Sequence, residues 1–349
     1  MGIRRQLAQR LADMSSSSLE AALASKMEYI SRLHTSPMAV ETDAANAQHY
    51  EVGTGVLEAC LGPRMKYSCC LYEKGGETLA QAEMAMLRTY LARAELEDGM
   101  RILDLGCGWG SGAVFFAEML PNSSITAFSN SKTQKEYIDA VGKEKGLKNL
   151  SVITGDVVDY EFESRSFDRV VSIEVSNSSS LLILIFDLPI ISPRGSQSQL
   201  FEHMKNYNLL MAKIARAMKP GGKLFVHMFA HRSMPYDYDT GWMATHFFTG
   251  GTMSSADLLL YFQRDLHVRR QWWVSGLHYS RTCEDWLHNM LGSRHKMWPA
   301  LVETYGGEQE ARVWWNRWQV FYMACSELFA YEGGDAWGIV HYLFEKPAA

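Results

Sequence analysis

The residues best suited to bind a cofactor begin with a glycine-rich loop in the first third of the chain. Gly106, Gly108 and Gly110 alternate with other residues directly after Asp104. Because glycines lack side chains, the backbone of such a loop can closely approach a ligand, and Asp104 could hold the loop through hydrogen bonds. Glycine-rich turns serve several cofactors, so the loop alone is weak evidence for any one of them.

Two details bear on which cofactor the loop binds. The dinucleotide pattern has a third glycine three residues after the second, where this chain has Ser111. That pattern also has an acidic residue after the second strand to hold the ribose hydroxyls, whereas this chain has Phe128-Ser-Asn there. A nicotinamide cofactor therefore becomes the minority interpretation.

Five motifs, taken together in their order and spacing, resemble one family of S-adenosyl-L-methionine-dependent enzymes. The sequence resembles the coclaurine N-methyltransferase and cyclopropane-fatty-acid synthase superfamily from about Met65 to the C-terminus. The set is highly specific, although no single motif would be. The motifs are Lys66-Tyr-Ser-Cys-Cys, Asp104-Leu-Gly-Cys-Gly-Trp-Gly, Phe128-Ser-Asn-Ser-Lys-Thr-Gln, Phe201-Glu-His-Met-Lys-Asn-Tyr and Phe247-Phe-Thr-Gly-Gly-Thr-Met.

This resemblance implies that S-adenosyl-L-methionine is the cofactor and that the glycine-rich loop holds it. In the family, a polar pair replaces the acid of the second strand, and Asn130 and Gln134 match that pair. Both amides can donate and accept hydrogen bonds. By the same resemblance, Tyr67 and Ser68 close over the cofactor and Ile173 lines its pocket.

Asp156 and Val157 follow the predicted third strand and match the family position that contacts the adenine. From the residue pattern alone, Asp156 could equally be a turn residue after Gly155, because Asp and Gly are both common in turns. The two interpretations are about even without the resemblance.

Other residues could handle a proton. An alkylamine acceptor is largely protonated near neutral pH, so a carboxylate or an imidazole should help to remove that proton before methyl transfer. Glu174, at the end of the predicted fourth strand, and Glu202-His203 are the candidates. The resemblance implies that Glu202 and His203 handle the proton and that Glu174 attracts the ammonium. Without it, Glu202-His203 is more simply a polar helix start.

Cys325 matches a cysteine near the reacting centre of the wider family, on the bicarbonate side in the cyclopropane branch. The residue pattern alone favours a packed thiol, because Cys325 shares one predicted helical face with Trp314, Trp318, Phe321 and Phe329. Aromatic faces attract cations by about 0.5–2 kcal/mol each. The aromatic C-terminal half therefore suits a cationic acceptor, but it could equally be ordinary core.

One segment departs from the family. Relatives have two residues between the glutamate of the fourth strand and Glu-His-Met, whereas here Ser176 to Leu200 adds a serine run, an apolar run and Pro193-Arg-Gly. The segment has no clean helical or strand period. We hypothesise a retained intron or a gene-model error. The alternative is a genuine loop at the mouth of the site, which costs little closure entropy.

The elements that must position these residues alternate through the middle of the chain. This alternation predicts a Rossmann-like α/β fold with a mostly parallel seven-stranded sheet and ligands at the carboxyl ends of its strands. We expect a helical cap over residues 1–95 and a methyltransferase domain over 96–349, with an acceptor-binding helical portion at about 230–332. Strands are predicted at 101–105, 124–129, 150–155, 167–173, 224–228 and 338–345, and helices at 19–27, 79–91, 113–120, 133–144 and before Met218.

Composition limits the partners. A net charge of −5 gives no reason to expect nucleic acid. Six cysteines without paired CxxC spacing predict neither a metal site nor a disulfide framework, which favours a reducing compartment. The N-terminus lacks a signal peptide's apolar region, and the most apolar run, 181–191, is too short to span a bilayer. We expect a cytoplasmic protein, for which a homodimer is one conceivable state.

These observations predict an S-adenosylmethionine-dependent N-methyltransferase acting on a small amine of the tetrahydroisoquinoline kind. The first alternative is methylene transfer to an unsaturated lipid, as in the cyclopropane branch. Lys205-Asn-Tyr and the Phe-Phe-Thr-Gly-Gly segment resemble the amine branch more closely. The second alternative is a protein that binds the cofactor but is inactivated by the segment 176–200.

Overall fold

The computed structural model describes residues 2–38, 54–173, 201, 204–238, 247 and 251–348. Glu174, Glu202, His203 and the whole segment 176–200 lie outside these residues. Within them, no helix is long and apolar enough to cross a membrane.

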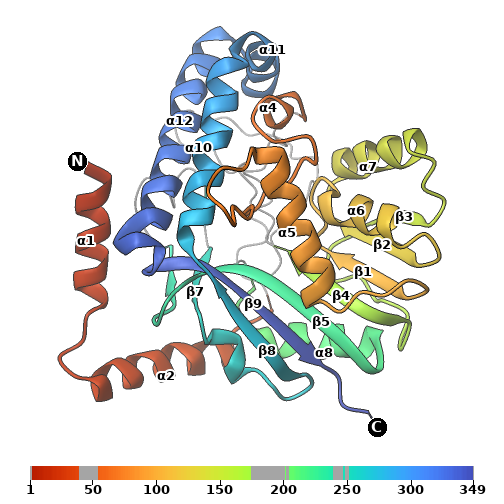
Figure 1. The fold of residues 1–349 in the computed structure, drawn as a ribbon. Coiled ribbons are helices and arrows are strands. Elements are labelled where there is room, and N and C mark those ends of the chain that lie inside the picture. Colours follow the sequence, from red (N-terminus) through yellow and green to blue (C-terminus); the bar gives the residue numbers. More distant parts are fainter. Residues whose placement is uncertain are drawn as a thin grey trace, which may run out of the picture.

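A mostly parallel sheet forms the centre of the molecule (Figure 1). Seven strands follow the order β3-β2-β1-β4-β5-β9-β8, in which the first five are parallel and β9 and β8 are antiparallel to their neighbours. Two short strands, β7 and β6, extend from the end of β5. The bounds are β1 Arg101–Leu105, β2 Ser124–Ser129, β3 Leu150–Thr154, β4 Phe167–Ile173, β5 Met218–His231, β6 Tyr236–Asp237, β7 Thr252–Ser255, β8 His267–Val274 and β9 Trp337–Glu345.

Residues 218–223, which precede the predicted strand 224–228, belong to β5 and form a bulge at its start. Met218 pairs with Phe167, but Lys223 is the next residue of β5 to pair with β4, opposite Arg169. Gly221 lies in the left-handed region with φ +70°, which a residue with a Cβ adopts only at a cost. The additional residues of β5 between Met218 and Lys223 therefore bulge out of the sheet and do not end the strand.

Helices cover both faces of the sheet. The helices α5 (Leu79–Arg93), α6 (Ser111–Met119) and α7 (Lys132–Glu144) pack with one hydrophobic core. On the other face, α8 (Tyr207–Ala217) and the short 3-10 helix η1 (Leu258–Tyr261) pack with a second core, to which α2 (Leu19–Thr35) contributes Ile30 and Leu33. The crossovers between parallel strands thus bury the sheet on both sides.

Local sequence signals explain where several of these helices begin. Thr78 and Gln81 form a capping box at the start of α5, and the Ser18 and Ser131 side chains cap α2 and α7. Such caps satisfy backbone N–H groups that have no partner within the helix.

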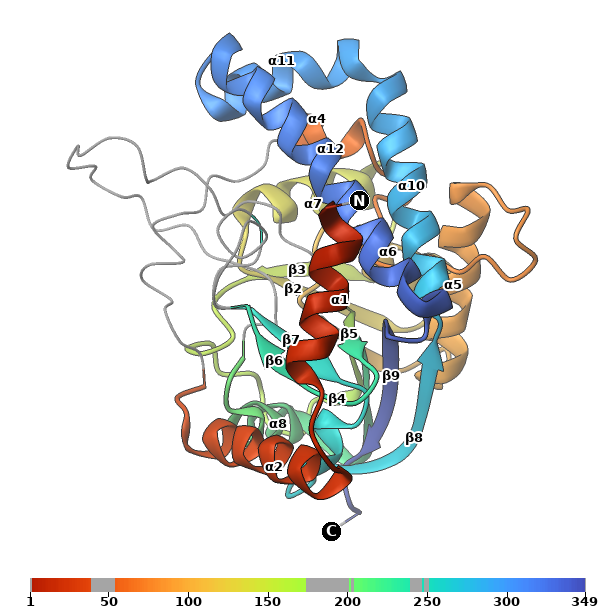
Figure 2. The same ribbon diagram turned by 90° about the vertical axis from the view of Figure 1, so that its left-hand side faces the viewer.

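A helical layer stands at the end of the sheet where the parallel strands terminate (Figure 1). It consists of α10 (Gly276–Gly292), α11 (Arg294–Tyr305) and α12 (Glu308–Ala330), with α4 (Thr54–Glu58) against α11 and the 3-10 helix η2 (Tyr331–Gly334) leading into β9. The N-terminal helix α1 (Gly2–Met14) runs beside α12, where Arg4 and Glu327 form an ion pair, and α2 lies against α8 (Figure 2).

Candidate active site

The glycine-rich loop opens onto a cleft at the carboxyl ends of β1 and β4. This is the edge at which ligands bind in open parallel sheets. The lining comes from the end of β1 and the loop after it with the start of α6, from the segment before α5, from α5 itself, and from single residues of α7 and β4. The lining residues are Met65, Lys66, Tyr67, Ser68, Leu87, Tyr90, Asp104, Gly106, Cys107, Gly108, Trp109, Ser111, Gly112, Gln134 and Ile173.

The backbone of the loop requires its glycines. Gly106, Gly108 and Gly110 all have positive φ, at 82°, 52° and 78°. A Cβ on Gly110 would lie 2.6 Å from Cγ1 of Ile138 on α7, so Gly110 also permits close packing between α6 and α7. The N–H groups of Gly106 and Cys107 both donate to the carbonyl of Phe128 at 3.0 Å, which ties the loop to β2.

Asp104 lies at the floor of the cleft and is almost fully buried, with 1% of its surface exposed. Among the described residues, neither of its carboxylate oxygens has a hydrogen-bond partner, so the expected hydrogen bonds to the loop are not formed. Burial raises the pKa of its carboxyl to about 7, while the nearby backbone N–H of Ala113 partly opposes that rise. A buried carboxylate without a partner is costly, and a ligand that carries a positive charge would relieve that cost.

These residues fit S-adenosylmethionine. The amino-acid part of this cofactor carries an ammonium that could pair with Asp104, and Ser111 Oγ is a second buried polar atom with no partner among the described residues. Gln134 is held in place because Ser129 Oγ donates to its Oε1 at 2.6 Å and its own backbone N–H donates to Ser131 Oγ. Polar groups for the ligand and a backbone cradle thus lie in one cleft.

A second part of the cleft lining is the short segment before α5. Lys66 is buried, and its Nζ donates to Ser68 Oγ at 2.5 Å and to the Cys69 carbonyl at 2.6 Å. Sequence reasoning named Tyr67 and Ser68 but missed Lys66 and Tyr90. Lys66 begins the Lys-Tyr-Ser-Cys-Cys motif, which was the available signal, but lysine is rarely fully buried.

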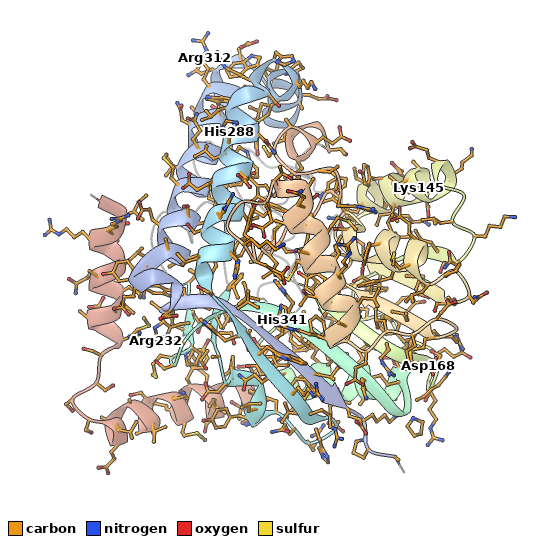
Figure 3. The ribbon with its side chains drawn as sticks, in the orientation of Figure 1. Lys145, Asp168, Arg232, His288, Arg312 and His341 are labelled. Atoms are coloured by element: carbon orange, nitrogen blue, oxygen red, sulfur yellow. The ribbon has the colours of Figure 1, made fainter. Side chains whose placement is uncertain are left out.

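Tyr90 connects the cleft to a buried pair of histidines. Its hydroxyl lies 3.2 Å from Nδ1 of His227, which lies 2.7 Å from Nε2 of His341. His341, on β9, lies in the interior between the sheet and α5 (Figure 3). Burial lowers the pKa of both imidazoles well below their ordinary value. Nothing in the sequence pattern indicated this pair.

The structure brings some of the predicted cofactor residues together and places others outside this cleft. Tyr67, Ser68, Gly106, Gly108, Gln134 and Ile173 line it, whereas Gly110, Asn130, Asp156 and Val157 do not. Gly110 is the N-cap residue of α6. Asp156 accepts the N–H of Val158 at 2.8 Å, as a turn residue does, and Val157 packs into the second core. The cofactor contacts of these four residues stay predictions.

The residues predicted to handle the proton are not described, but their neighbours in the chain are. Ile173 immediately precedes Glu174 and lines the cleft. The backbone N–H of Lys205, two residues after His203, donates to the Met38 carbonyl at 2.9 Å. Cys325 is buried on α12 and does not line this cleft.

Comparison with known proteins decides the family. The model of the mycolic acid cyclopropane synthetase family matches residues 39–338. The chain belongs to this family. It is 36% identical to (S)-coclaurine N-methyltransferase of Papaver somniferum over 99% of this chain and 92% of that protein. It is 26% identical to cyclopropane-fatty-acyl-phospholipid synthase of Escherichia coli K12, over 84% of this chain and 66% of that protein.

A solved structure of a coclaurine N-methyltransferase, bound to N-methylheliamine and S-adenosylhomocysteine (SAH), superimposes with a TM-score of 0.84. The two chains are 31% identical, and the superposition covers 99% of this chain and 92% of that one. The predictions of a Rossmann-like fold, of S-adenosylmethionine as cofactor and of a methyltransferase are confirmed. This family member is an S-adenosylmethionine-dependent methyltransferase.

Proposed function

We propose that this family member methylates the nitrogen of a small amine of the tetrahydroisoquinoline kind. The likeness to coclaurine N-methyltransferases along 99% of the chain carries this proposal. The cyclopropane synthase is a more distant relative, at 26% identity.

Aromatic rings that continue from the cofactor cleft support an amine acceptor. Tyr67 lines the cleft, and its ring centroid lies 5.2 Å from that of Trp286 on α10. Trp286 lies edge-on to Tyr279 at 6.1 Å, and Tyr279 stacks on Phe329 of α12 at 4.4 Å. All four rings are buried within the first hydrophobic core, and a face that opens toward the acceptor would attract an ammonium and pack against the apolar part of the acceptor.

The chain's own residues would then perform binding and proton removal. Bound S-adenosylmethionine supplies an electrophilic methyl group. Asp104 would pair with the cofactor's ammonium, and Tyr67 and Ser68 would close over the cofactor. Glu202 or His203 would accept the proton from the acceptor nitrogen, which exposes its lone pair, and Glu174 would attract the ammonium beforehand.

The remaining expectations are part of this proposal. Residues 1–95 would serve as a helical cap on the methyltransferase domain of 96–349, and the helical layer within about 230–332 would hold the acceptor near Cys325. A cytoplasmic location stays a prediction, which rests on the lack of paired cysteine spacing in the sequence. Homodimer formation stays a prediction.

An acceptor screen tests the proposal. The purified full chain is incubated with methyl-labelled S-adenosylmethionine and, separately, with tetrahydroisoquinoline amines or vesicles of unsaturated phospholipid. We expect label in the amine product and none in lipid. Label in lipid alone would support cyclopropane formation instead. Cofactor binding without label in any acceptor would support inactivation by the segment 176–200.

A further inference from the structure

A fully buried carboxylate contacts the segment of residues 62–68, part of which lines the cofactor cleft. Glu83, on α5, has no exposed surface. Its Oε2 accepts the backbone N–H of Arg64 at 3.1 Å, and its Oε1 accepts that of Lys66 at 3.4 Å. The segment that it binds leads directly into Tyr67, which lines the cleft. Glu83 itself does not line the cleft, so any effect that it has on the cleft must pass through this segment.

The segment is built to close around this carboxylate. A Cβ on Gly62 would lie 2.5 Å from Cδ of Glu83 and 2.6 Å from each carboxylate oxygen. Real Cβ atoms do not approach other atoms so closely, so only glycine allows the backbone to pass here. Gly62 therefore lies against the same group that binds the amides of Arg64 and Lys66.

Hydrogen bonds also hold the C-terminal end of this segment in place. The ammonium of Lys66 donates to Ser68 Oγ and to the Cys69 carbonyl, which holds the part that faces the cleft in one shape. On α5, Leu87 and Tyr90 follow Glu83 by four and seven residues, so they share its helical face, and both line the cleft. The same face of α5 thus holds the segment and forms part of the cleft.

Packing alone gives no reason for a carboxylate at this place. Burial raises the pKa of the Glu83 carboxyl to about 7, while its hydrogen bonds to the Arg64 and Lys66 amides and the positive charges of these two residues oppose that rise. An apolar side chain would avoid the burial cost but could not bind two backbone N–H groups. The energetic cost is explained if the position of this segment matters.

We propose that Glu83 is a positioning residue of the cofactor site, which holds residues 62–68 so that Tyr67 and Ser68 face S-adenosylmethionine. The inference rests on the proposed assignment of Tyr67 and Ser68 to the cofactor. It assigns Glu83 no contact with the reacting atoms.

Glu83→Gln is the first test, because an amide places an NH2 donor against one of the two backbone N–H groups. We expect the Kd for SAH, measured by calorimetry at pH 8, to rise about tenfold. The KM for S-adenosylmethionine should rise similarly, while the KM for the amine acceptor stays within about twofold. A lower melting temperature with an unchanged Kd for SAH would show a purely structural role and overturn the inference.

Gly62→Ala tests the same contact from the other side and keeps the carboxylate. It should displace Glu83 and weaken SAH binding. In a Glu83→Ala background the clashing atoms are absent, so Gly62→Ala should then change the Kd for SAH less than twofold. Gly142→Ala is the matched control, because its Cβ would meet only Leu150 at an ordinary 3.5 Å. Equal effects of Gly62→Ala in both backgrounds would contradict a role through Glu83.

Tyr67→Ala separates failure of the inference from failure of the proposed site. If Tyr67→Ala weakens SAH binding but Glu83→Gln and Gly62→Ala do not, the inference alone is wrong. If none of the three variants changes the Kd for SAH, the assignment of this segment to the cofactor is wrong as well. Should Glu83→Gln fail to fold, the Gly62→Ala measurement decides.

Discussion

Arg93 donates from Nη1 to Nδ1 of His341 at 2.6 Å, although the two residues are 248 positions apart. A guanidinium can only donate, so Nδ1 of His341 must accept and its proton must sit on Nε2. That Nε2–H can then donate to Nδ1 of His227, 2.7 Å away. Arg93 therefore sets the tautomers of both histidines, and both are neutral.

The neutral pair should make stability depend on pH. Both histidines have folded-state pKa values well below the ordinary 6.5, because burial opposes their charging. Their contribution is complete above pH 6.5 and is lost as the pH falls below it, since only the unfolded chain then binds protons. The free energy of unfolding should fall by up to about 1.4 kcal/mol per pH unit for each histidine. Denaturant unfolding at pH 7.5 and 5.5 measures this slope.

His341→Gln tests whether His341 contributes to this dependence of the free energy of unfolding on pH. Its amide oxygen can accept from Arg93 and its NH2 can donate to His227, so the hydrogen bonds persist while one titrating group is lost. The variant should lose stability less steeply with falling pH than the parent chain. Identical slopes would show that His341 does not titrate on unfolding as proposed.

Asp104 should control cofactor affinity. Its carboxyl has a pKa of about 7 and no hydrogen-bond partner among the described residues, so pairing with the ammonium of SAH favours the ionised form. Affinity should therefore fall as the pH drops below 7, with proton release on binding. Asp104→Asn should weaken SAH binding about tenfold and remove this pH dependence. Calorimetry at pH 6 and 8 in two buffers of different ionisation enthalpy measures both. Binding by the parent chain without proton release would contradict the pairing.

The segment 176–200 should impair chemistry more than cofactor binding. Its removal joins Val175 to Phe201 and restores the family spacing between Glu174 and Glu202. A misplacement of catalytic groups by about 1 Å can cost roughly a hundredfold in rate. We expect the shortened chain to have a higher kcat and an unchanged Kd for SAH. A lower kcat after deletion would favour a genuine working loop.

Gly110→Ala should destabilise the start of α6. The substitution places a Cβ at φ +78° and 2.6 Å from Cγ1 of Ile138. Gly75 has the same φ of +78° but no atom within 4 Å, so Gly75→Ala isolates the backbone strain, about 1–2 kcal/mol. Gly110→Ala should cost about 1–3 kcal/mol more because of the clash. Equilibrium unfolding of both variants measures the difference, and equal losses would exclude a packing role for Gly110.

The fold class could be predicted from residues that are close in the sequence, whereas the cofactor followed from the order and spacing of five motifs along the chain. The glycine spacing after Asp104, the Thr78 cap and the alternation of strands and helices are local patterns. They reflect backbone geometry and hydrogen bonds within a few residues, so a linear chain displays them. Strands β1 to β4 lie within one residue of their predicted ranges.

The burial and the hydrogen bonds of the side chains in and around the cleft depend on contacts between distant parts of the chain. Asp104 was expected to bond its own loop, yet folding leaves its carboxylate buried and open to a ligand. Glu83 reaches back to Arg64 and Lys66, and Arg93 reaches forward to His341. Burial and long-range hydrogen bonds arise only when the sheet and its helices pack together, and no periodicity along the chain records which side chains will meet there.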